Sequence, residues 1–163
     1  MKRSKVVSLE ESLEEMSVIE YGRRNFRKSM ELSKKLLIIN PDSIVALNSL
    51  AGIYFSFGSS EKALSYLTRA LELAPNDPVV NYNIGIIYLI ESVDPEKALP
   101  YLKKAKKFNS SKEPYVYAYL SLCNHLLGNI KASRQQCMAA HRLAPQDEVV
   151  YNLAETIDLE LPY

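Results

Sequence analysis

The sequence predicts an all-α fold built from tandem pairs of antiparallel helices. Glu61–Leu67 (EKALSYL) recurs 35 residues later as Glu96–Leu102 (EKALPYL). Pro75–Val80 (PNDPVV) recurs 70 residues later as Pro145–Val150 (PQDEVV). A regular period of this size is typical of solenoid proteins, in which each unit stacks only on its neighbours. Apolar residues within the units recur at spacings of three, four and seven, which favours helices over strands.

Small side chains recur at fixed places within this period. Small residues let two helix axes approach closely, so that one helix packs into the groove of the next. The places are Ala51, Gly85 and Ser121 in the first helices, and Ala63, Ala98, Ser133, Ala70, Ala105 and Ala140 in the second helices.

Local start and stop signals predict nine helices. Ser8 and Glu11 form a capping box, and proline stands at the first helical position at Pro78 and Pro95. The expected N-caps are Asp42, Asp77, Asp94, Asn129 and Asp147. Second helices are expected to end before Pro41, Pro75 and Pro145, because proline disfavours the helical conformation of the preceding residue.

These features together resemble the tetratricopeptide repeat family, whose unit is a helix–turn–helix of about 34 residues. The match is most complete at Leu47, Leu50, Ala51, Tyr54, Ala63, Leu67, Ala70 and Pro75. The resemblance implies a right-handed α-solenoid with an N-terminal extension (1–9), four helix pairs (10–43, 44–77, 78–113 and 114–147) and a C-terminal capping helix (148–163).

Several units depart from the family pattern. Ser29 and Ser33 stand where the first pair should have an alanine and a large apolar residue. Ser110 and Ser111 replace a closing proline. Asn124, Ser133 and Cys137 replace preferred aromatic and small residues. These units therefore match the family pattern less completely than 44–77.

The resemblance also implies that the first helices line a concave groove. The candidate binding residues are Asn48, Phe55, Val79, Tyr82, Asn83, Ile86, Leu89, Tyr115, Leu122, His125 and Asn152. Because exposed apolar surface of this kind usually marks a binding site, we expect an amphipathic helix or extended peptide of a partner protein as the guest. The expected function is a protein–protein interaction scaffold, adaptor or chaperone-like.

Two alternatives remain open at this point. The first is a homo-oligomerisation module whose groove or open end is occupied by a second copy of the chain. The second is an acidic partner or RNA on the lysines between Lys103 and Lys107, although a solvated face is the simpler interpretation. Phe108 is the one aromatic residue beside these lysines, so a nucleic-acid partner is not expected.

No constellation in the sequence indicates catalysis or a cofactor. No glycine-rich phosphate loop or Gly-x-Ser-x-Gly motif is present, and we expect no enzyme activity. Cys137 and His141 are four residues apart, but zinc would need Cys123 as a third ligand. We interpret both cysteines as reduced packing residues. No metal site is expected.

Composition favours one soluble globular domain. The 163 residues carry a formal net charge of +1, which gives no bulk field for nucleic acid or an acidic membrane. No stretch approaches the ~18 apolar residues of a membrane span. The apolar run after the basic N-terminus is too short for an export signal. The expected location is the cytoplasm, with no membrane partner.

Overall fold

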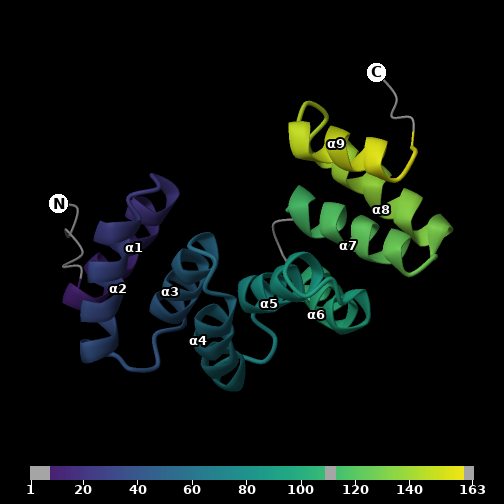
Figure 1. Ribbon diagram of the computed structural model, residues 1–163. Coiled ribbons are helices and arrows are strands. Elements are labelled where there is room, and N and C mark those ends of the chain that lie inside the picture. The colour runs from purple at the N-terminus through teal and green to yellow at the C-terminus, as the bar shows by residue number, and fades with distance from the viewer. Residues whose placement is uncertain (1–7, 109–112, 160–163) are drawn as a thin grey trace. The chain divides into compact units, whose positions relative to one another are not determined.

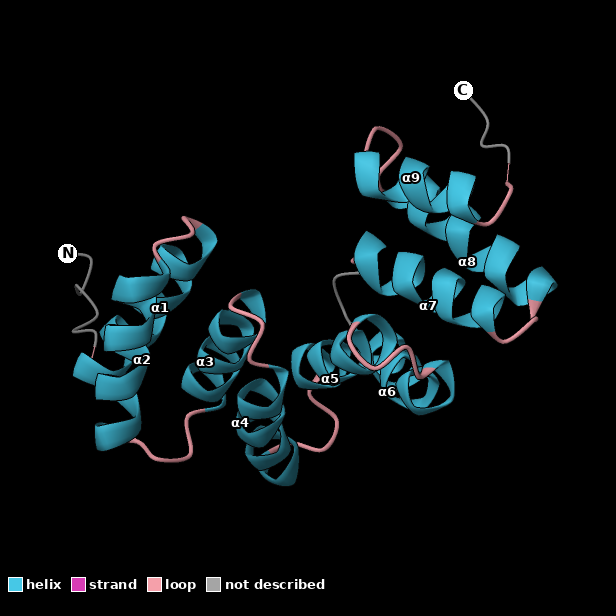
Figure 2. Ribbon diagram, in the orientation of Figure 1, coloured by secondary structure: helices cyan, strands magenta, loops and turns pink. Residues whose placement is uncertain are grey.

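A computed structural model describes residues 8–108 and 113–159, and over these residues the chain forms nine helices and no strand (Figures 1 and 2). The helices are α1 (Leu9–Gly22), α2 (Phe26–Ile39), α3 (Ile44–Ser56), α4 (Ser60–Leu73), α5 (Pro78–Ile90), α6 (Pro95–Phe108), α7 (Pro114–Leu126), α8 (Ile130–Leu143) and α9 (Glu148–Thr156). The predicted all-α fold of helix pairs is confirmed.

The contacts between helices divide the chain into two compact units, and the boundary in the sequence lies between Pro75 and Asn76. In unit 1, α1 pairs with α2 and α3 with α4, while α3 also contacts α1 and α2. In unit 2, α5 pairs with α6 and α7 with α8, and α7 also contacts α5, α6 and α9. The domain organisation expected from the sequence stays a prediction.

The small residues that the repeat predicted are all buried where helices approach one another. Ala51, Ala63 and Ala70 lie buried in unit 1, and Ala98, Ala105 and Ala140 lie buried in unit 2. Gly85 shows how close this approach is. A Cβ placed there would lie 2.7 Å from Leu102 Cγ of the paired helix. The repeat signature therefore records the helix contacts themselves.

Serines replace alanines in two pairs and form a hydrogen bond across the pair. Ser29 Oγ of α2 donates to the carbonyl oxygen of Ser17 in α1 at 2.9 Å. Ser121 Oγ of α7 donates to the carbonyl oxygen of Ser133 in α8 at 2.8 Å. All four serines are buried. Because the hydroxyls are satisfied, these departures from the family pattern keep the same close packing.

Most of the predicted caps are confirmed. Ser8 and Glu11 make both hydrogen bonds of the capping box. Asp77 and Asp147 accept from the backbone N–H of Val80 and Val150 at the starts of α5 and α9. Asp94 Oδ1 accepts from the backbone N–H of Lys97 in the first turn of α6.

One predicted cap is wrong, and another is the N-cap residue without a side-chain capping bond. Ser43, not Asp42, is the N-cap of α3, and its Oγ accepts from the backbone N–H of Ala46. A serine hydroxyl caps as well as a carboxylate, so the choice depends on where the turn ends. Asn129 is the N-cap residue of α8, but its Nδ2 donates to Asn124 Oδ1 instead of capping.

The expected helix ends agree with the structure. The helices α2, α4 and α8 each end two residues before Pro41, Pro75 and Pro145 respectively. The first helix begins at Leu9, one residue before the expected boundary. Three parts of the predictions lie outside the described residues: most of the expected N-terminal extension, the serines Ser110 and Ser111, and residues 160–163 of the expected cap. None of the described helices has the length and hydropathy needed to cross a membrane.

The close approach at Gly85 leads to a stability prediction. Gly85→Ala should lower the free energy of unfolding by up to about 2 kcal/mol, because overpacking costs about 1–3 kcal/mol and the helix propensity of alanine returns about 1 kcal/mol. Urea unfolding followed by far-UV circular dichroism measures the change. Gly22→Ala is the matched control, since a Cβ there meets nothing within 4 Å. Equal effects at the two glycines would contradict the contact.

Candidate functional site

The first helices of unit 2 present an apolar and uncharged face. Neither Pro78–Ile90 (α5) nor Pro114–Leu126 (α7) contains an Asp, Glu, Lys or Arg residue. Tyr82 of α5 and Tyr119 of α7 meet with ring centroids 6.0 Å apart in an edge-on arrangement. Tyr82, Tyr119 and Leu122 are all half-buried and pack against the same core cluster. We call Val79, Tyr82, Tyr115, Tyr119 and Leu122 the first-helix face of unit 2.

A hydrogen bond connects this face to the last helix. The hydroxyl of Tyr115 donates to Asp147 Oδ2 at 2.8 Å, and Asp147 Oδ1 caps α9 through the backbone N–H of Val150. The Asp147 carboxylate raises the pKa of Tyr115 through this hydrogen bond, and its negative charge raises it further. Burial raises the pKa of Tyr119. Both hydroxyls therefore stay protonated at neutral pH and can donate hydrogen bonds.

The structure leaves most candidate residues of unit 2 at least partly exposed. Val79 is 53% exposed, and Tyr115 and Asn152 are also exposed. The half-buried candidates are Tyr82, Asn83, Leu122 and His125. Tyr82 and Leu122, which lie 40 residues apart in the sequence, contact the same cluster and form one continuous apolar area with Tyr119.

Two candidate residues were placed on the binding surface wrongly. Ile86 is 7% exposed and Leu89 is 3% exposed. Leu89 packs in the core cluster that also contains Leu102 of α6 and Val116 of α7. Because α5 is covered mainly by its partner α6, and also contacts α7, these two side chains offer little surface to a guest.

The two candidates of unit 1 lie on α3. Asn48 and Phe55 are both half-buried there. Between them, Gly52 is covered by Tyr21 of α1, since a Cβ at Gly52 would lie 2.5 Å from the Tyr21 hydroxyl oxygen. Tyr21 also contacts the Phe26 ring, with the two centroids 5.7 Å apart. Sequence analysis did not identify Tyr21 as a residue that packs against Gly52. The available signal was an aromatic residue near the end of the first helix.

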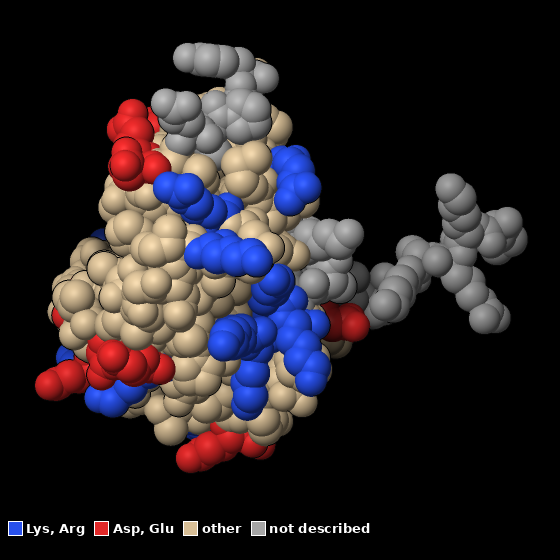
Figure 3. Space-filling view, turned by 90° about the vertical axis from the view of Figure 1, so that its right-hand side faces the viewer, with Lys and Arg blue, Asp and Glu red and all other residues tan. Residues whose placement is uncertain are grey.

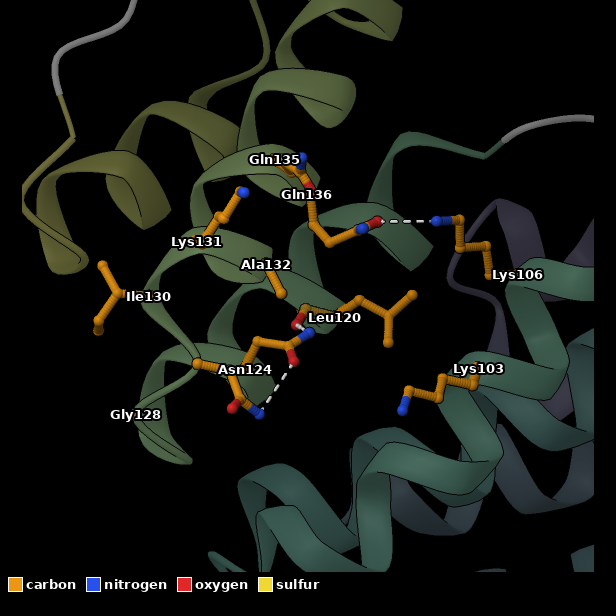
Figure 4. Close-up of a pocket in the computed structure, with 11 residues that line it drawn as sticks. Lys103, Lys106, Leu120, Asn124, Gly128, Ile130, Lys131, Ala132, Gln135 and Gln136 are labelled. Atoms are coloured by element: carbon orange, nitrogen blue, oxygen red, sulfur yellow. Dashed lines mark hydrogen bonds between the residues drawn. The ribbon is translucent and has the colours of Figure 1, made fainter.

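A second feature of unit 2 is an open groove of about 770 Å³ between α6, α7 and α8. It is lined by Lys103, Lys106, Leu120, Asn124, Gly128, Asn129, Ile130, Lys131, Ala132, Gln135 and Gln136. We call it the α6–α8 groove. Figure 4 shows Lys103 and Lys106 extending from α6 toward α7 and α8. Lys106 Nζ donates to Gln136 Oε1 at 3.2 Å. Sequence analysis named the lysines of α6 but did not predict this groove. The other lining residues lie between Leu120 and Gln136, too far along the chain for a local pattern to associate them with Lys103 and Lys106.

Comparison with known proteins agrees with this geometry. Residues 44–77 match the family described as Tetratricopeptide repeat. No curated protein matches the chain. The chain carries a tetratricopeptide repeat and has the fold of that family.

Three solved structures illustrate the similarity of fold. PilW, a type IV pilus biogenesis factor, superposes with a TM-score of 0.79 at 16% identity, over 93% of this chain and 71% of PilW. TTC0263, a tetratricopeptide repeat protein of Thermus thermophilus, gives 0.73 at 20% identity, over 92% and 82%. YrrB, a tetratricopeptide repeat protein with an unusual peptide-binding site, gives 0.68 at 16% identity, over 89% and 74%.

The cysteines of this tetratricopeptide fold are part of its packing. Cys123 and Cys137 are buried and free, and Cys123 Sγ lies 3.2 Å from the carbonyl oxygen of Pro95. Burial raises the pKa of the Cys123 thiol to about 11 and also raises that of Cys137. Protonated, buried thiols are poor nucleophiles. Within 8–108 and 113–159, no three His, Cys, Asp or Glu side chains are grouped so that they could hold a metal.

The shifted pKa of Cys123 predicts a pH dependence of stability. Its folded value, about 11, lies above the ordinary value of 9.0, so the folded state holds this proton more tightly than the unfolded state. That contribution is complete below pH 9 and is lost as the pH rises toward 11. Urea unfolding should therefore show a smaller loss of stability over this range for Cys123→Ser than for the wild type.

Thiol reactivity gives an independent check of the same burial. Ellman's reagent at a pH of about 8 should react with the folded chain at least about tenfold more slowly than with the urea-unfolded chain, because only an exposed thiolate attacks it. Rapid reaction of the folded chain, or identical pH profiles of wild type and Cys123→Ser, would contradict the buried thiol.

Proposed function

We propose that this chain is a protein–protein interaction scaffold, an adaptor or chaperone-like protein, that binds a peptide or helix of a partner protein through its first helices. The observation that carries the proposal is the first-helix face of unit 2, an aromatic and apolar surface on two helices without a single charged residue. Monomeric proteins rarely leave such surface unused. On unit 1, the proposal includes Asn48 and Phe55 of α3.

The chemistry of this face suits an amphipathic guest. Apolar guest side chains would bury against Tyr82, Tyr119 and Leu122 and gain roughly 25 cal/mol per Å² before the costs of ordering. The amides of Asn83 and Asn152 can hydrogen-bond the guest. With a face of this size we expect about micromolar affinity for a short peptide. The peptide-binding site of YrrB supports this use of the fold.

The proposal assigns no reaction to the chain. It depends on apolar surface and hydrogen-bonding groups, and neither the first-helix face nor the α6–α8 groove combines a nucleophile with a general base. The cytoplasmic location inferred from the sequence stays a prediction.

Self-association is a second candidate, favoured by one observation on α1. Met16 and Ile19 are 45% and 42% exposed, whereas Leu50 and Ile53, which follow them by 34 residues, are completely buried. Helix α3 contacts α1 and α2 as well as its partner α4, whereas α1 contacts α2 and α3 alone among the described helices. A second copy of the chain could cover Met16 and Ile19.

The first-helix face can be tested by substitution. Tyr82→Ala with Leu122→Ala should abolish capture of the partner from native cell extract while far-UV helicity is retained, because both side chains contact the guest. Val79→Glu should also weaken capture. Val79 is exposed in the first turn of α5, where an acidic residue favours the helix dipole, so this variant should fold normally.

Phe108→Ala with Leu143→Ala is the matched control, since it removes two exposed apolar side chains from the second helices. A partner that is retained by both face variants would refute the proposed surface.

Self-association predicts a mass that grows with concentration and returns to that of the monomer in Met16→Lys with Ile19→Lys, as measured by light scattering.

A further inference from the structure

The charges of unit 2 are gathered on its second helices. In α8, Lys131, Arg134 and Arg142 occur without an acidic residue between Ile130 and Leu143. Helix α6 has a single acid, Glu96, and its basic residues are Lys97, Lys103, Lys104, Lys106 and Lys107. Figure 3 shows the basic side chains gathered along one side of the face that it presents. Since α5 and α7 carry no charge, this cationic surface is separate from the first-helix face.

The α6–α8 groove lies within this cationic surface. Lys103 and Lys106 enter it from α6, and Lys131 enters it from the start of α8. No Asp or Glu residue lines the groove, and no ion pair joins these three lysines to a carboxylate of the described residues. Positive charges that are concentrated in a concavity attract a negative ligand more strongly than the same charges on a convex surface.

The remaining lining residues suit a polypeptide. The side-chain amides of Asn129, Gln135 and Gln136 provide donors and acceptors that can pair with a guest backbone. Asn124 is buried, and its amide donates to the Leu120 carbonyl oxygen and accepts from Asn129 Nδ2. Ala132 and the exposed Ile130 provide an apolar area beside these amides, whereas Leu120 is buried in the core. Lys106 Nζ is held by Gln136 Oε1 and also lies 5.1 Å from the Tyr117 ring centroid, so one cation is already positioned.

We infer that the α6–α8 groove binds an acidic segment of a partner protein in an extended conformation. Guest carboxylates would pair with Lys103, Lys106 and Lys131, the exposed amides would bond the guest backbone, and one apolar guest side chain would contact Ala132 and Ile130. The inference goes beyond the proposed function, because it concerns a different surface, whose cations come from second helices, and a guest of opposite character.

A nucleic acid fits this groove less well. Binding of single strands relies on aromatic side chains that stack with bases, and no aromatic residue lines the groove. Bidentate recognition of phosphate favours arginine, and the cations that line the groove are all lysines. The mixture of amides and apolar atoms matches a peptide more closely than a sugar–phosphate backbone.

The test uses the full chain and a fluorescein-labelled peptide that is rich in glutamate, with a single central leucine. Fluorescence anisotropy should show saturable binding that weakens as salt rises, because the lysines are partly solvated. Lys103→Glu with Lys131→Glu should weaken binding at least about tenfold, since two attractions become repulsions. The same peptide with glutamine in place of glutamate should not bind.

The matched control is Lys107→Glu with Arg134→Glu. These residues lie on the same two helices and give the same change of net charge, but neither lines the groove. The control should weaken binding less than about threefold, by the long-range field alone. All four positions are exposed, so both variants should retain the far-UV spectrum and unfolding midpoint of the wild type.

Three outcomes would overturn the inference. Equal weakening by the two double variants would mean attraction by general surface charge without a groove. Tighter binding of single-stranded oligouridylate, in competition with the peptide and sensitive to the same lysines, would make the groove a nucleic-acid site. No binding of the acidic peptide at low salt would remove the groove as a site for acidic segments. The first-helix variants leave this readout unchanged, so failure of one proposal does not decide the other.

Discussion

The structure depends on close contact between the two helices of each pair. At Gly85 the approach leaves no room for a Cβ beside Leu102, and Ala63, Ala70, Ala98 and Ala105 are completely buried. At Ser29 and Ser121, the serine hydroxyl donates a hydrogen bond to the backbone of the paired helix. The side chains that do not take part in these contacts form the exposed surfaces of the protein.

This constraint separates the chemistry of the faces. In unit 2, the apolar residues left over on α5 and α7 form an uncharged area, whereas the exposed residues of α6 and α8 are mostly lysine and arginine. An apolar guest and an acidic guest would therefore contact different surfaces of the same unit. A scaffold built from helix pairs can combine two specificities in this way, because first and second helices face different solvent regions.

The same packing also buries two side chains, a cysteine and a histidine, that the sequence offered as candidate reactive or metal-binding groups. Cys123 lies in the core and beside the Pro95 carbonyl, and burial keeps it protonated. His141 is buried on α8 with its ring edge-on to Tyr151. Both residues occupy places where the helix pairs stack, so their side chains fill space between helices and are shielded from solvent.

The sequence by itself determined the helix pairs, the prolines that end them and the buried small residues, because these signals are local or recur at a fixed period. It also predicted Tyr82 and Leu122 as binding residues, and this stays a prediction. Tertiary structure alone decided that Leu89 is core and that Lys131 joins Lys103 in one groove. Helical periodicity gives the side of a helix on which a residue lies. Which side stays uncovered depends on how neighbouring pairs stack, and that depends on contacts between residues far apart in the chain.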